Sequence, residues 1–328
     1  MRVLIIRLSS IGDVILTTPI LKGLKEKYPD IKIDFIVMDK FKSAIEGSPY
    51  VDNLIVFNKK ENDGILNILK FAKKLKMNNY DYVIDLHGKL RSIVISKVIG
   101  GDQSRYRKRS WWKTLLVKFK LIKYNVDDTI VKNYFGAVKH LGIEYKGEDL
   151  DFAFERRDLE NIPEEYRGRP VFAPGASKNT KKWCTENFGE LAKLIHEKYG
   201  EKILIIGGKE DFLAAEEIDS ISGGNCINLC GTLTLKESGA LLSKSQYLVT
   251  NDSGPFHIAR GVKCKTYVIF GPTSPGMFEF KKGENLIYAN ESCSPCSLHG
   301  DKKCPQGHFK CMKSISGRYI FDVIERDK

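Results

Sequence analysis

Short polar segments in this chain hold side chains that could do chemistry. The first is Arg7-Leu-Ser-Ser-Ile-Gly-Asp13, which leads from an apolar run into an expected helix. A carboxylate in the first helical turn is favoured by the helix dipole, and it could take a proton from a hydroxyl as a general base. Ser10 or Asp13 could equally well only cap the helix. The spacing alone leaves both interpretations open.

Two further segments suit a diphosphate and a ribose. Ala173-Pro-Gly-Ala-Ser177 is followed by Lys181-Lys-Trp183, so free N–H groups, a hydroxyl and an ammonium lie close together in the chain. Such groups bind phosphate oxygens. Ile206-Gly-Gly-Lys-Glu-Asp211 places an acid after an apolar run, where it could hold ribose hydroxyls or begin a helix. Ordinary strand–helix turns would explain both segments as well.

The segment Thr250-Asn-Asp-Ser-Gly-Pro-Phe-His257 gathers polar groups before a helix opened by proline. It predicts an anion or sugar site, in which His257 could brace Asp252 rather than act itself. Asp149-Leu-Asp151 has the letters of a metal motif, but it lies beside the expected linker and does not follow a predicted strand. No other Asp-x-Asp follows an apolar run, and no GxGxxG occurs. We therefore expect no cofactor for catalysis.

All eight cysteines lie after residue 183, and four of them cluster near the C-terminus. The four are Cys293, Cys296, Cys304 and Cys311. A reducing compartment favours metal over disulfide, and four thiolates could close a structural zinc site. Cys304 and Cys311 are separated by six residues, which is longer than the usual spacing of a cysteine pair in a zinc knuckle. Metal, disulfides and free thiols stay open.

Strand and helix patterns alternate along the chain, which predicts parallel, doubly wound α/β sheets. A length of 328 residues suits two domains of about 150 residues each. We expect an N-terminal Rossmann-like domain over 1–155 and a charged linker over 156–169. A second Rossmann-like domain is expected over 170–312, facing the first across a central cleft. A final helix over 313–328 could pack back on the first domain.

The net charge of +12 lies almost entirely in the first half. Residues 1–150 hold 28 Lys and Arg against 17 Asp and Glu, whereas the remainder holds 25 against 24. The run from Lys89 to Lys123 carries eleven basic residues and one acid. It predicts a negatively charged partner, either nucleic acid, anionic lipid or a phosphorylated glycan. A solvated lysine-rich surface would also account for the excess.

No apolar run is long enough to span a bilayer, and the first residues lack the apolar core of a secretory signal. We therefore expect a cytoplasmic protein that touches a membrane surface at most.

Taken together, the motifs resemble the heptosyltransferases of lipopolysaccharide assembly, glycosyltransferase family 9. The resemblance covers nearly the whole chain, and the order and spacing of the motifs are what make it specific. Besides the segments above, it includes Tyr82-Val-Ile-Asp-Leu-His-Gly88 and Phe270-Gly-Pro-Thr273. It implies a GT-B fold, an ADP-heptose donor, and metal-independent transfer with inversion.

The resemblance also implies a role for each site residue. Asp13 would be the base on the acceptor hydroxyl, and Lys181 would stabilise the leaving ADP. Donor contacts would come from Ser177, Lys181, Asp211, Leu233, Asp252, Ser253, Gly254 and His257. Many relatives have Glu where this chain has Asp211.

The acceptor would be the anionic Kdo and heptose inner core of lipopolysaccharide, met at the inner face of the inner membrane. Candidate contacts are Arg7, Ser10, His87, Arg91, Arg105, Arg107 and Arg109. The cysteine cluster looks structural in this family.

Two alternatives stay open. One is a GT-B transferase or epimerase that uses another nucleotide sugar, such as a UDP-sugar. A comparison of the affinities for ADP and UDP would distinguish this alternative from an ADP-heptose enzyme. The other is a basic nucleic-acid-binding protein, which predicts strongly salt-dependent binding but leaves the polar segments unexplained. We expect no nucleic-acid partner.

Overall fold

The computed structural model describes residues 1–106 and 128–328, and these fall into two units. The described part of the first unit is 1–106 and 128–153, and that of the second is 154–328. Arg107 and Arg109, two predicted acceptor contacts, lie outside the described residues. No helix within the described ranges is both long and apolar enough to cross a bilayer.

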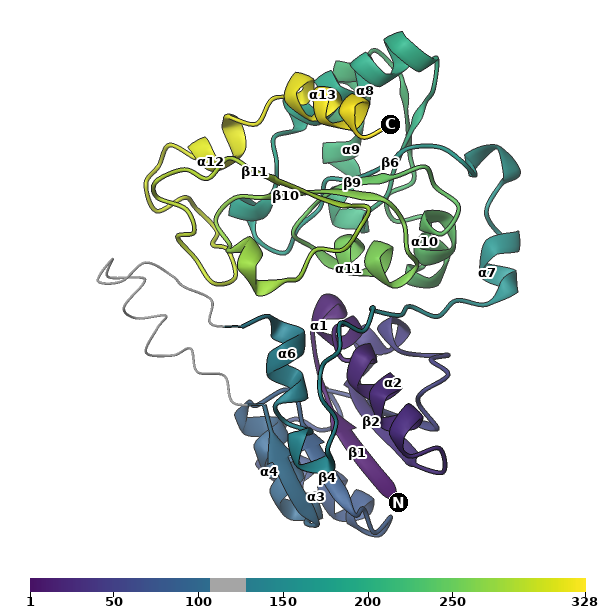
Figure 1. Cartoon of the computed structure of the whole chain (residues 1–328), viewed down its shortest axis with the longest axis vertical. Coiled ribbons are helices and arrows are strands. Elements are labelled where there is room, and N and C mark those ends of the chain that lie inside the picture. The colour runs from purple at the N-terminus through teal and green to yellow at the C-terminus, as the bar shows by residue number, and fades with distance from the viewer. Residues whose placement is uncertain (107–127) are drawn as a thin grey trace. The chain divides into compact units, whose positions relative to one another are not determined.

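The first unit is built on a five-stranded parallel sheet of order β3-β2-β1-β4-β5 (Figure 1). Its strands are β1 (Arg2–Ile6), β2 (Lys32–Met38), β3 (Asn53–Phe57), β4 (Tyr82–Asp85) and β5 (Asp102–Arg105). The central strands are buried on both faces, which explains their near-continuous Val and Ile content.

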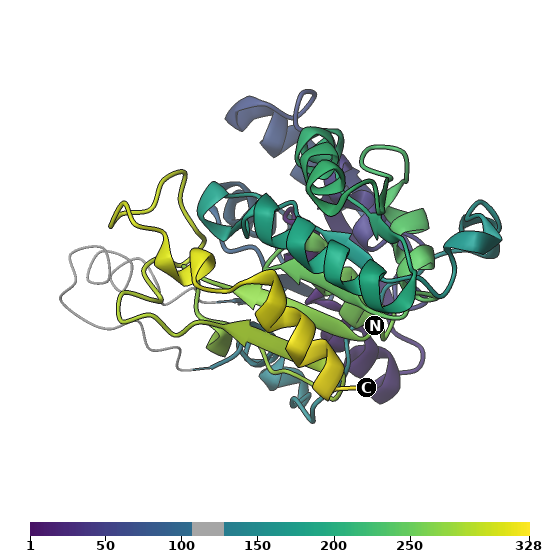
Figure 2. The same ribbon diagram turned by 90° about the horizontal axis from the view of Figure 1, so that it is seen from above.

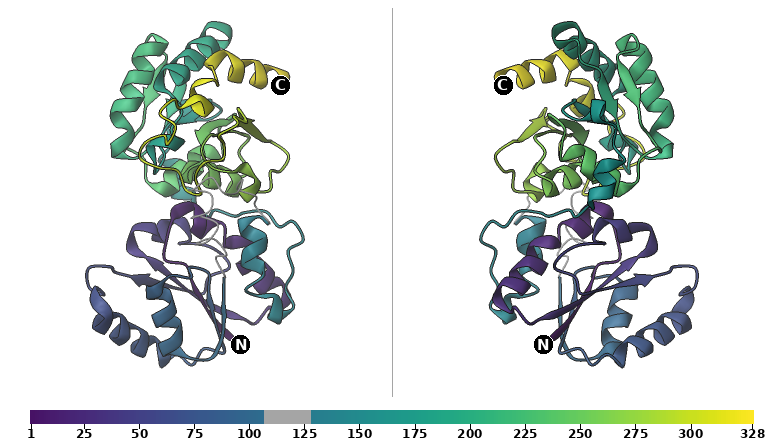
Figure 3. Two further views of the ribbon diagram at one scale, coloured as in Figure 1. Left: turned by 90° about the vertical axis from the view of Figure 1, so that its left-hand side faces the viewer. Right: turned by 90° about the vertical axis from the view of Figure 1, so that its right-hand side faces the viewer.

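Helices cover both faces of this sheet (Figure 3). They are α1 (Ile11–Ile15), α2 (Thr18–Lys27), α3 (Gly64–Lys76), α4 (Leu90–Ile99) and α6 (Ile130–Phe135), with 3-10 turns η1 (Asp39–Ala44) and η2 (Lys139–Leu141). Helices α3 and α4 pack together, and α2 contacts α6.

One predicted helix is divided in the structure. The pattern over 12–28 predicts a single helix, but α1 ends at Ile15 and α2 begins at Thr18. The hydroxyls of Thr17 and Thr18 donate to the carbonyls of Val14 and Ile15. Pro19 follows and cannot donate an N–H, so the hydrogen-bond ladder restarts there.

The second unit has a six-stranded parallel sheet of order β11-β10-β9-β6-β7-β8. Its strands are β6 (Val171–Ala173), β7 (Ile203–Ile205), β8 (Cys226–Asn228), β9 (Leu248–Asn251), β10 (Thr266–Phe270) and β11 (Glu284–Tyr288). Its α-helices are α7 (Arg156–Glu160), α8 (Thr185–Tyr199), α9 (Phe212–Ser222), α10 (Leu235–Leu242), α11 (Gly254–Gly261), α12 (Lys310–Lys313) and α13 (Gly317–Arg326). Its 3-10 turns are η3 (Glu164–Tyr166), η4 (Asn179–Lys181), η5 (Lys209–Asp211) and η6 (Pro275–Met277).

Both sheets therefore have the strand order of a nucleotide-binding doubly wound fold, as predicted. In each sheet the chain reverses its direction of winding at one switch point. This point lies between β1 and β4 in the first sheet and between β6 and β9 in the second. Ligands of such sheets bind at the carboxyl ends of the strands beside the switch point.

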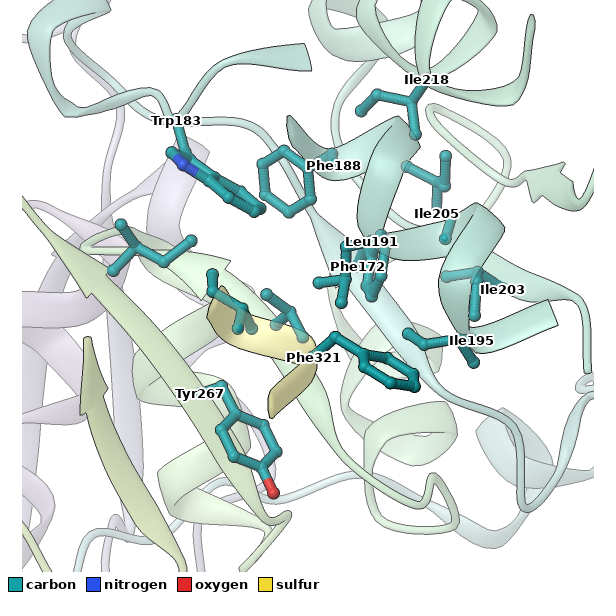
Figure 4. Close-up of a cluster of buried hydrophobic side chains, with 14 of the residues drawn as sticks. Phe172, Trp183, Phe188, Leu191, Ile195, Ile203, Ile205, Ile218, Tyr267 and Phe321 are labelled. Carbon is teal, nitrogen blue, oxygen red and sulfur yellow. The ribbon is translucent and has the colours of Figure 1, made fainter. Parts of the chain in front are cut away.

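The final helix packs within the second unit. Figures 1 and 2 show α13 alongside α8, and the two helices are in contact. Phe321 of α13 joins the core cluster that contains Phe172 and Phe188 (Figure 4). Glu325 pairs with Lys198, and it accepts a hydrogen bond from Tyr199. Contact of this helix with the first domain stays a prediction.

The segment predicted as a linker has structure of its own. Residues 156–169 contain α7 and η3, and α7 contacts α10 of the second unit. The division between units falls after Ala153, close to the expected boundary at residue 155.

Candidate active site

The first switch point holds Asp13 and Arg7. Asp13 stands in the first turn of α1, where Nη2 of Arg7 lies 2.6 Å from its Oδ2. The same oxygen accepts hydrogen bonds from the backbone N (3.2 Å) and Oγ (3.0 Å) of Ser10. Within the described part of the chain, no hydrogen bond goes to Oδ1. One third of the side chain is exposed, so that oxygen is the one free to meet a substrate.

Arg7 is held in place on several sides. Its Nη1 donates to the carbonyl of Leu86 at 2.5 Å, and its Nε donates to the carbonyl of Ser9 at 2.8 Å. The guanidinium also lies over the ring of Tyr134, 5.5 Å from its centre. Arg7 is buried, so its charge acts on Asp13 with little screening by water.

These contacts fix the charge of Asp13. Burial by itself would raise the pKa of the carboxyl, but the charge of Arg7 and the hydrogen bonds from Ser10 and Arg7 outweigh it. The net result is a pKa below the ordinary value, so the side chain is a carboxylate at neutral pH. Only an ionised carboxylate can accept a proton, and this geometry supplies one.

The loop after β4 and the first turn of α4 contribute a histidine and two cations. His87 is buried, and within 1–106 and 128–328 its Nδ1 has no hydrogen-bond partner. Burial, together with the charges of Arg7, Lys89 and Arg91, lowers its pKa to about 3, against a smaller opposite effect of Asp13. The imidazole is therefore neutral at physiological pH. Arg91 lies over the ring of Phe57, and its Nε is also buried without a partner.

Asp85 anchors this loop, and our sequence reasoning gave it no role of its own. Its Oδ1 accepts hydrogen bonds from the backbone N of His87 and Gly88, and its Oδ2 accepts one from Ser92. The same Oδ2 accepts one from Nε of Arg105 at 3.0 Å. Arg105, expected to contact the acceptor, is thus engaged with a fully buried carboxylate. The available signal was an acid that ends an apolar strand.

The second switch point holds Lys181 and Asp252. Nζ of Lys181, from η4, lies 2.8 Å from Oδ2 of Asp252, which follows β9. Oγ1 of the buried Thr273 donates to the same oxygen at 2.8 Å. The structure thus brings together two residues predicted separately as donor contacts, and Thr273 joins them. Ser253 and Gly254 lie at the start of α11, with Pro255 in its first turn.

Asn251 ties two loops of this site together. Its side chain is fully buried; Oδ1 accepts from the backbone N of Trp183 at 3.0 Å, and Nδ2 donates to the carbonyl of Pro174 at 2.7 Å. Asn251, at the end of β9, thus holds both the loop after β6 and the segment just before α8. An asparagine has one acceptor and two donors, which suits this bridging role.

Asp211 lies beside the loop after β6. Its Oδ2 accepts from the backbone N of Gly208 at 3.1 Å, and Nζ of Lys182 is 3.6 Å from Oδ1. A Cβ atom at Gly175 would come within 2.7 Å of the Asp211 carboxyl carbon, so a larger residue there would require the Asp211 side chain to move. The predicted diphosphate and ribose segments are therefore neighbours.

The other predicted donor contacts are Ser177, Leu233 and His257, which differ in how deeply they are buried. Ser177 is exposed on the loop before η4, and Leu233 is half-buried between β8 and α10. His257 is buried in α11, and its ring centre is 5.2 Å from that of Phe278. Its surroundings are thus partly aromatic rather than purely polar.

The cysteine segment packs against the loop that carries Lys181. The backbone N and Oγ1 of Thr180 donate to the carbonyl of Asp301, whose own backbone N donates back to that Oγ1 at 2.7 Å. Burial, reinforced by the neighbouring thiols, raises the pKa of Cys296 to about 11 and of Cys311 to about 12. Across the described ranges, no three His, Cys, Asp or Glu side chains are arranged to hold a metal ion. The structure therefore does not show the zinc site that the four cysteines could form.

Two doubly wound units, each with polar side chains at its switch point, define a two-domain α/β enzyme. Comparison with known proteins narrows the class. The family model of glycosyltransferase family 9 (heptosyltransferase) matches residues 68–306. The chain belongs to this family, and it is a glycosyltransferase.

Relatives and solved structures agree with this assignment. The chain is 26% identical over 322 residues to lipopolysaccharide heptosyltransferase 1 of Campylobacter coli, covering 92% of this chain and 93% of that protein. The structure of E. coli ADP-heptose lps heptosyltransferase II has a TM-score of 0.78 at 18% identity, covering 100% and 98% of the two chains. E. coli heptosyltransferase WaaC with ADP-2-deoxy-2-fluoro heptose has a TM-score of 0.74 at 21% identity and covers both chains completely. The likeness to the solved structures supports the GT-B fold.

Proposed function

We propose that this enzyme transfers heptose from ADP-heptose to the anionic inner core of lipopolysaccharide, with inversion and without a catalytic metal ion. The observation that carries the proposal is the carboxylate of Asp13, held ionised by Arg7 and with one oxygen free. Relatives named lipopolysaccharide heptosyltransferases support the substrate class, and a neighbouring structure has been determined with an ADP-heptose analogue.

In the proposed reaction, an acceptor hydroxyl attacks the anomeric carbon of the heptose from the side opposite ADP. The new C–O bond forms as the bond from that carbon to the diphosphate oxygen breaks. Oδ1 of Asp13 takes the hydroxyl proton, and the bonding electron pair leaves on ADP. Attack from the opposite side inverts the configuration at the anomeric carbon.

Lys181 would stabilise the leaving ADP. Its ammonium carries three hydrogens, and Asp252 engages one of them, so two remain for diphosphate oxygens. The N-terminus of α11 adds N–H groups and the positive end of a helix dipole. A cation fixed where negative charge develops does the work that a metal ion does in other transferases.

Asp211 would bind the ribose, while Ser177, Leu233, Ser253, Gly254 and His257 would complete the donor site. Arg7 and Ser10 would act on the acceptor through Asp13, whose oxygen they both bind. We also propose peripheral contact with the inner membrane surface, because the first half of the chain is strongly basic. Zinc on the four cysteines stays a separate prediction, for which elemental analysis of purified protein is the measurement.

The deciding experiment incubates purified protein with ADP-heptose and Kdo-lipid A, and it follows the products by mass spectrometry. We expect a product heavier by one heptose residue, with release of ADP and no loss of rate in EDTA. NMR of the product tests inversion of the anomeric configuration. Calorimetry should show binding of ADP in preference to UDP; the reverse preference would favour the UDP-sugar alternative.

A further inference from the structure

The basic side chains around Asp13 differ in whether a carboxylate already pairs with them. Arg7 pairs with Asp13, and Arg105 pairs with Asp85. Within the described ranges, neither Lys89 nor Arg91 pairs with any carboxylate. Positive charge that is neutralised inside the fold attracts a substrate anion weakly, whereas uncompensated charge attracts it strongly. Among the basic side chains that act on His87, the uncompensated charge therefore lies on Lys89 and Arg91, at the end of the loop after β4 and in the first turn of α4.

His87 lies among these free charges. It is only 8% exposed, and its Nδ1 has no hydrogen-bond partner among the residues that the structure describes. A buried polar atom without a partner destabilises a protein by about 1–3 kcal/mol, so such atoms are usually satisfied. The groups that act on this imidazole are Arg7, Lys89, Arg91 and the carboxylate of Asp13. Three of the four are cations, which is the setting of an anion site.

Arg91 repeats the pattern. Its Nε is buried and also lacks a partner in the described part of the chain, while its guanidinium carbon lies 5.6 Å from the centre of the Phe57 ring. The aromatic contact holds the guanidinium without using any of its N–H groups. Two unsatisfied polar atoms, one from the loop after β4 and one from the first turn of α4, therefore point to a ligand that the described part of the chain does not supply.

We propose that His87, Lys89 and Arg91 form the subsite for the anionic substituent of the acceptor, a carboxylate or phosphate carried by a sugar. This inference rests on the proposed function and sharpens it, because it separates these three residues from Arg7 and Arg105. An anion bound here would hold the acceptor near Asp13, because the charge of Asp13 acts on the His87 ring. Lys89 was not among the residues predicted from the sequence.

A bound anion reverses the field at His87. The cations around the imidazole now disfavour its protonation; an anion bound among them favours it. Anion binding therefore raises the pKa of His87 and is coupled to partial proton uptake at low pH. A purely structural histidine would show no such response, so the imidazole reports occupancy of this subsite.

The first experiment uses the unmodified full-length protein and NMR of its histidine rings, with the His87 signal assigned by its loss in His87→Gln. The probes are Kdo, its uncharged methyl ester and a sugar phosphate. We expect Kdo or the sugar phosphate to shift the His87 signal and raise its pKa, while the ester does neither. The anion that acts at lower concentration identifies the group bound. No response to either anion overturns the subsite.

The second experiment measures kinetics of Arg91→Met, whose side chain still covers Phe57. We expect the acceptor KM to rise about tenfold or more, as for loss of a charged hydrogen bond, with the donor KM unchanged. Lys97→Met is the matched control, since Lys97 lies exposed in the last turn of α4. An unchanged acceptor KM in Arg91→Met, in an enzyme that transfers heptose normally, overturns the inference but not the proposed function.

The converse outcome is equally distinct. If the protein transfers no heptose to any acidic core acceptor, the proposed function fails. A response of His87 to the anions would still support the subsite in that case.

Discussion

The ammonium of Lys181 lies 2.8 Å from Oδ2 of Asp252, and Thr273 donates to that same oxygen. Lysine side chains are flexible, and most of their conformations would not reach a given phosphate. The nearly buried carboxylate holds this one in a single position, and Thr273 in turn holds the carboxylate. The pair therefore delivers a positioned cation at the carboxyl end of β9.

Removal of this cation should weaken donor binding. We expect Lys181→Met to reduce ADP affinity by about tenfold or more, because a charged hydrogen bond is lost and Asp252 is left without its partner. Calorimetry with ADP measures the change. Lys193→Met, on the exposed face of α8, is the control and should bind ADP normally. Unchanged affinity in Lys181→Met would refute its role at the diphosphate.

Asp13→Asn should abolish most transfer without affecting ADP binding. An amide cannot accept the hydroxyl proton, so we expect kcat to fall by about a hundredfold to ten-thousandfold. The ADP affinity should stay near that of the wild type, since the donor residues lie in the other unit. Asp39→Asn, in the exposed turn after β2, serves as the control. Full turnover in Asp13→Asn would exclude Asp13 as the base.

The pH profile should depend on Arg7. The pKa of Asp13 is lowered, so the acid limb of kcat/KM due to Asp13 should lie below the ordinary aspartate value of about 3.9. In Arg7→Met the desolvation that raises this pKa is no longer opposed by the guanidinium charge, and the limb should move to higher pH. Arg7→Lys keeps a cation and should shift it less. An identical limb in all three proteins would contradict the assignment.

The pair of Arg7 and Asp13 should also make the free energy of unfolding depend on pH in a predictable direction. A carboxyl whose pKa is lowered on folding stabilises the protein above its unfolded-state pKa, and this contribution is lost as pH falls through the folded-state value. The stability difference between wild type and Arg7→Met should therefore be larger at pH 7 than near pH 3. Urea unfolding at the two pH values measures it.

Asn251→Ala should loosen the donor loops. The substitution leaves the N–H of Trp183 and the carbonyl of Pro174 buried without partners, and we expect a loss of about 2 kcal/mol in unfolding free energy. The donor KM should rise as well, because both loops carry donor contacts. Asn285→Ala, at a surface strand end, should change neither. Wild-type stability of Asn251→Ala would show that the bridging bonds contribute little.

A methyl group at Gly175 should displace Asp211. We expect Gly175→Ala to raise the donor KM, because the new Cβ would lie 2.7 Å from the Asp211 carboxyl carbon. A double-mutant cycle with Asp211→Ala tests the cause. The effect of Gly175→Ala should largely vanish in the Asp211→Ala background. Equal effects in both backgrounds would place the strain elsewhere.

Central strands and site loops could be predicted from the sequence because burial on both faces leaves continuous apolar runs. β1, β2 and β10 all carry this signal. The edge strand β5 does not: it has the sequence DQSR, and among the described residues it pairs with β4 alone. Pairing of the backbone, rather than side-chain pattern, defines that strand, so only the folded sheet shows it.

The residues of the candidate site also fall into those that the sequence could predict and those that only the fold shows. Asp13, Lys181 and Asp252 could be predicted because their residue types and their places after strands indicate chemistry. The partners that position them could not, since Thr273 and Asp85 meet their partners only through the fold. Arg105 illustrates the limit: a basic residue in a basic run looks available for a substrate until its buried carboxylate is seen.

The division of the chain after Ala153 has an evolutionary consequence. Each unit has its own sheet and its own set of loops. Under the proposed function, mutations that alter sugar-acceptor preference in the first unit need not disturb nucleotide recognition in the second. Exchange of whole halves between relatives is therefore a route by which such enzymes can diversify the glycans they build.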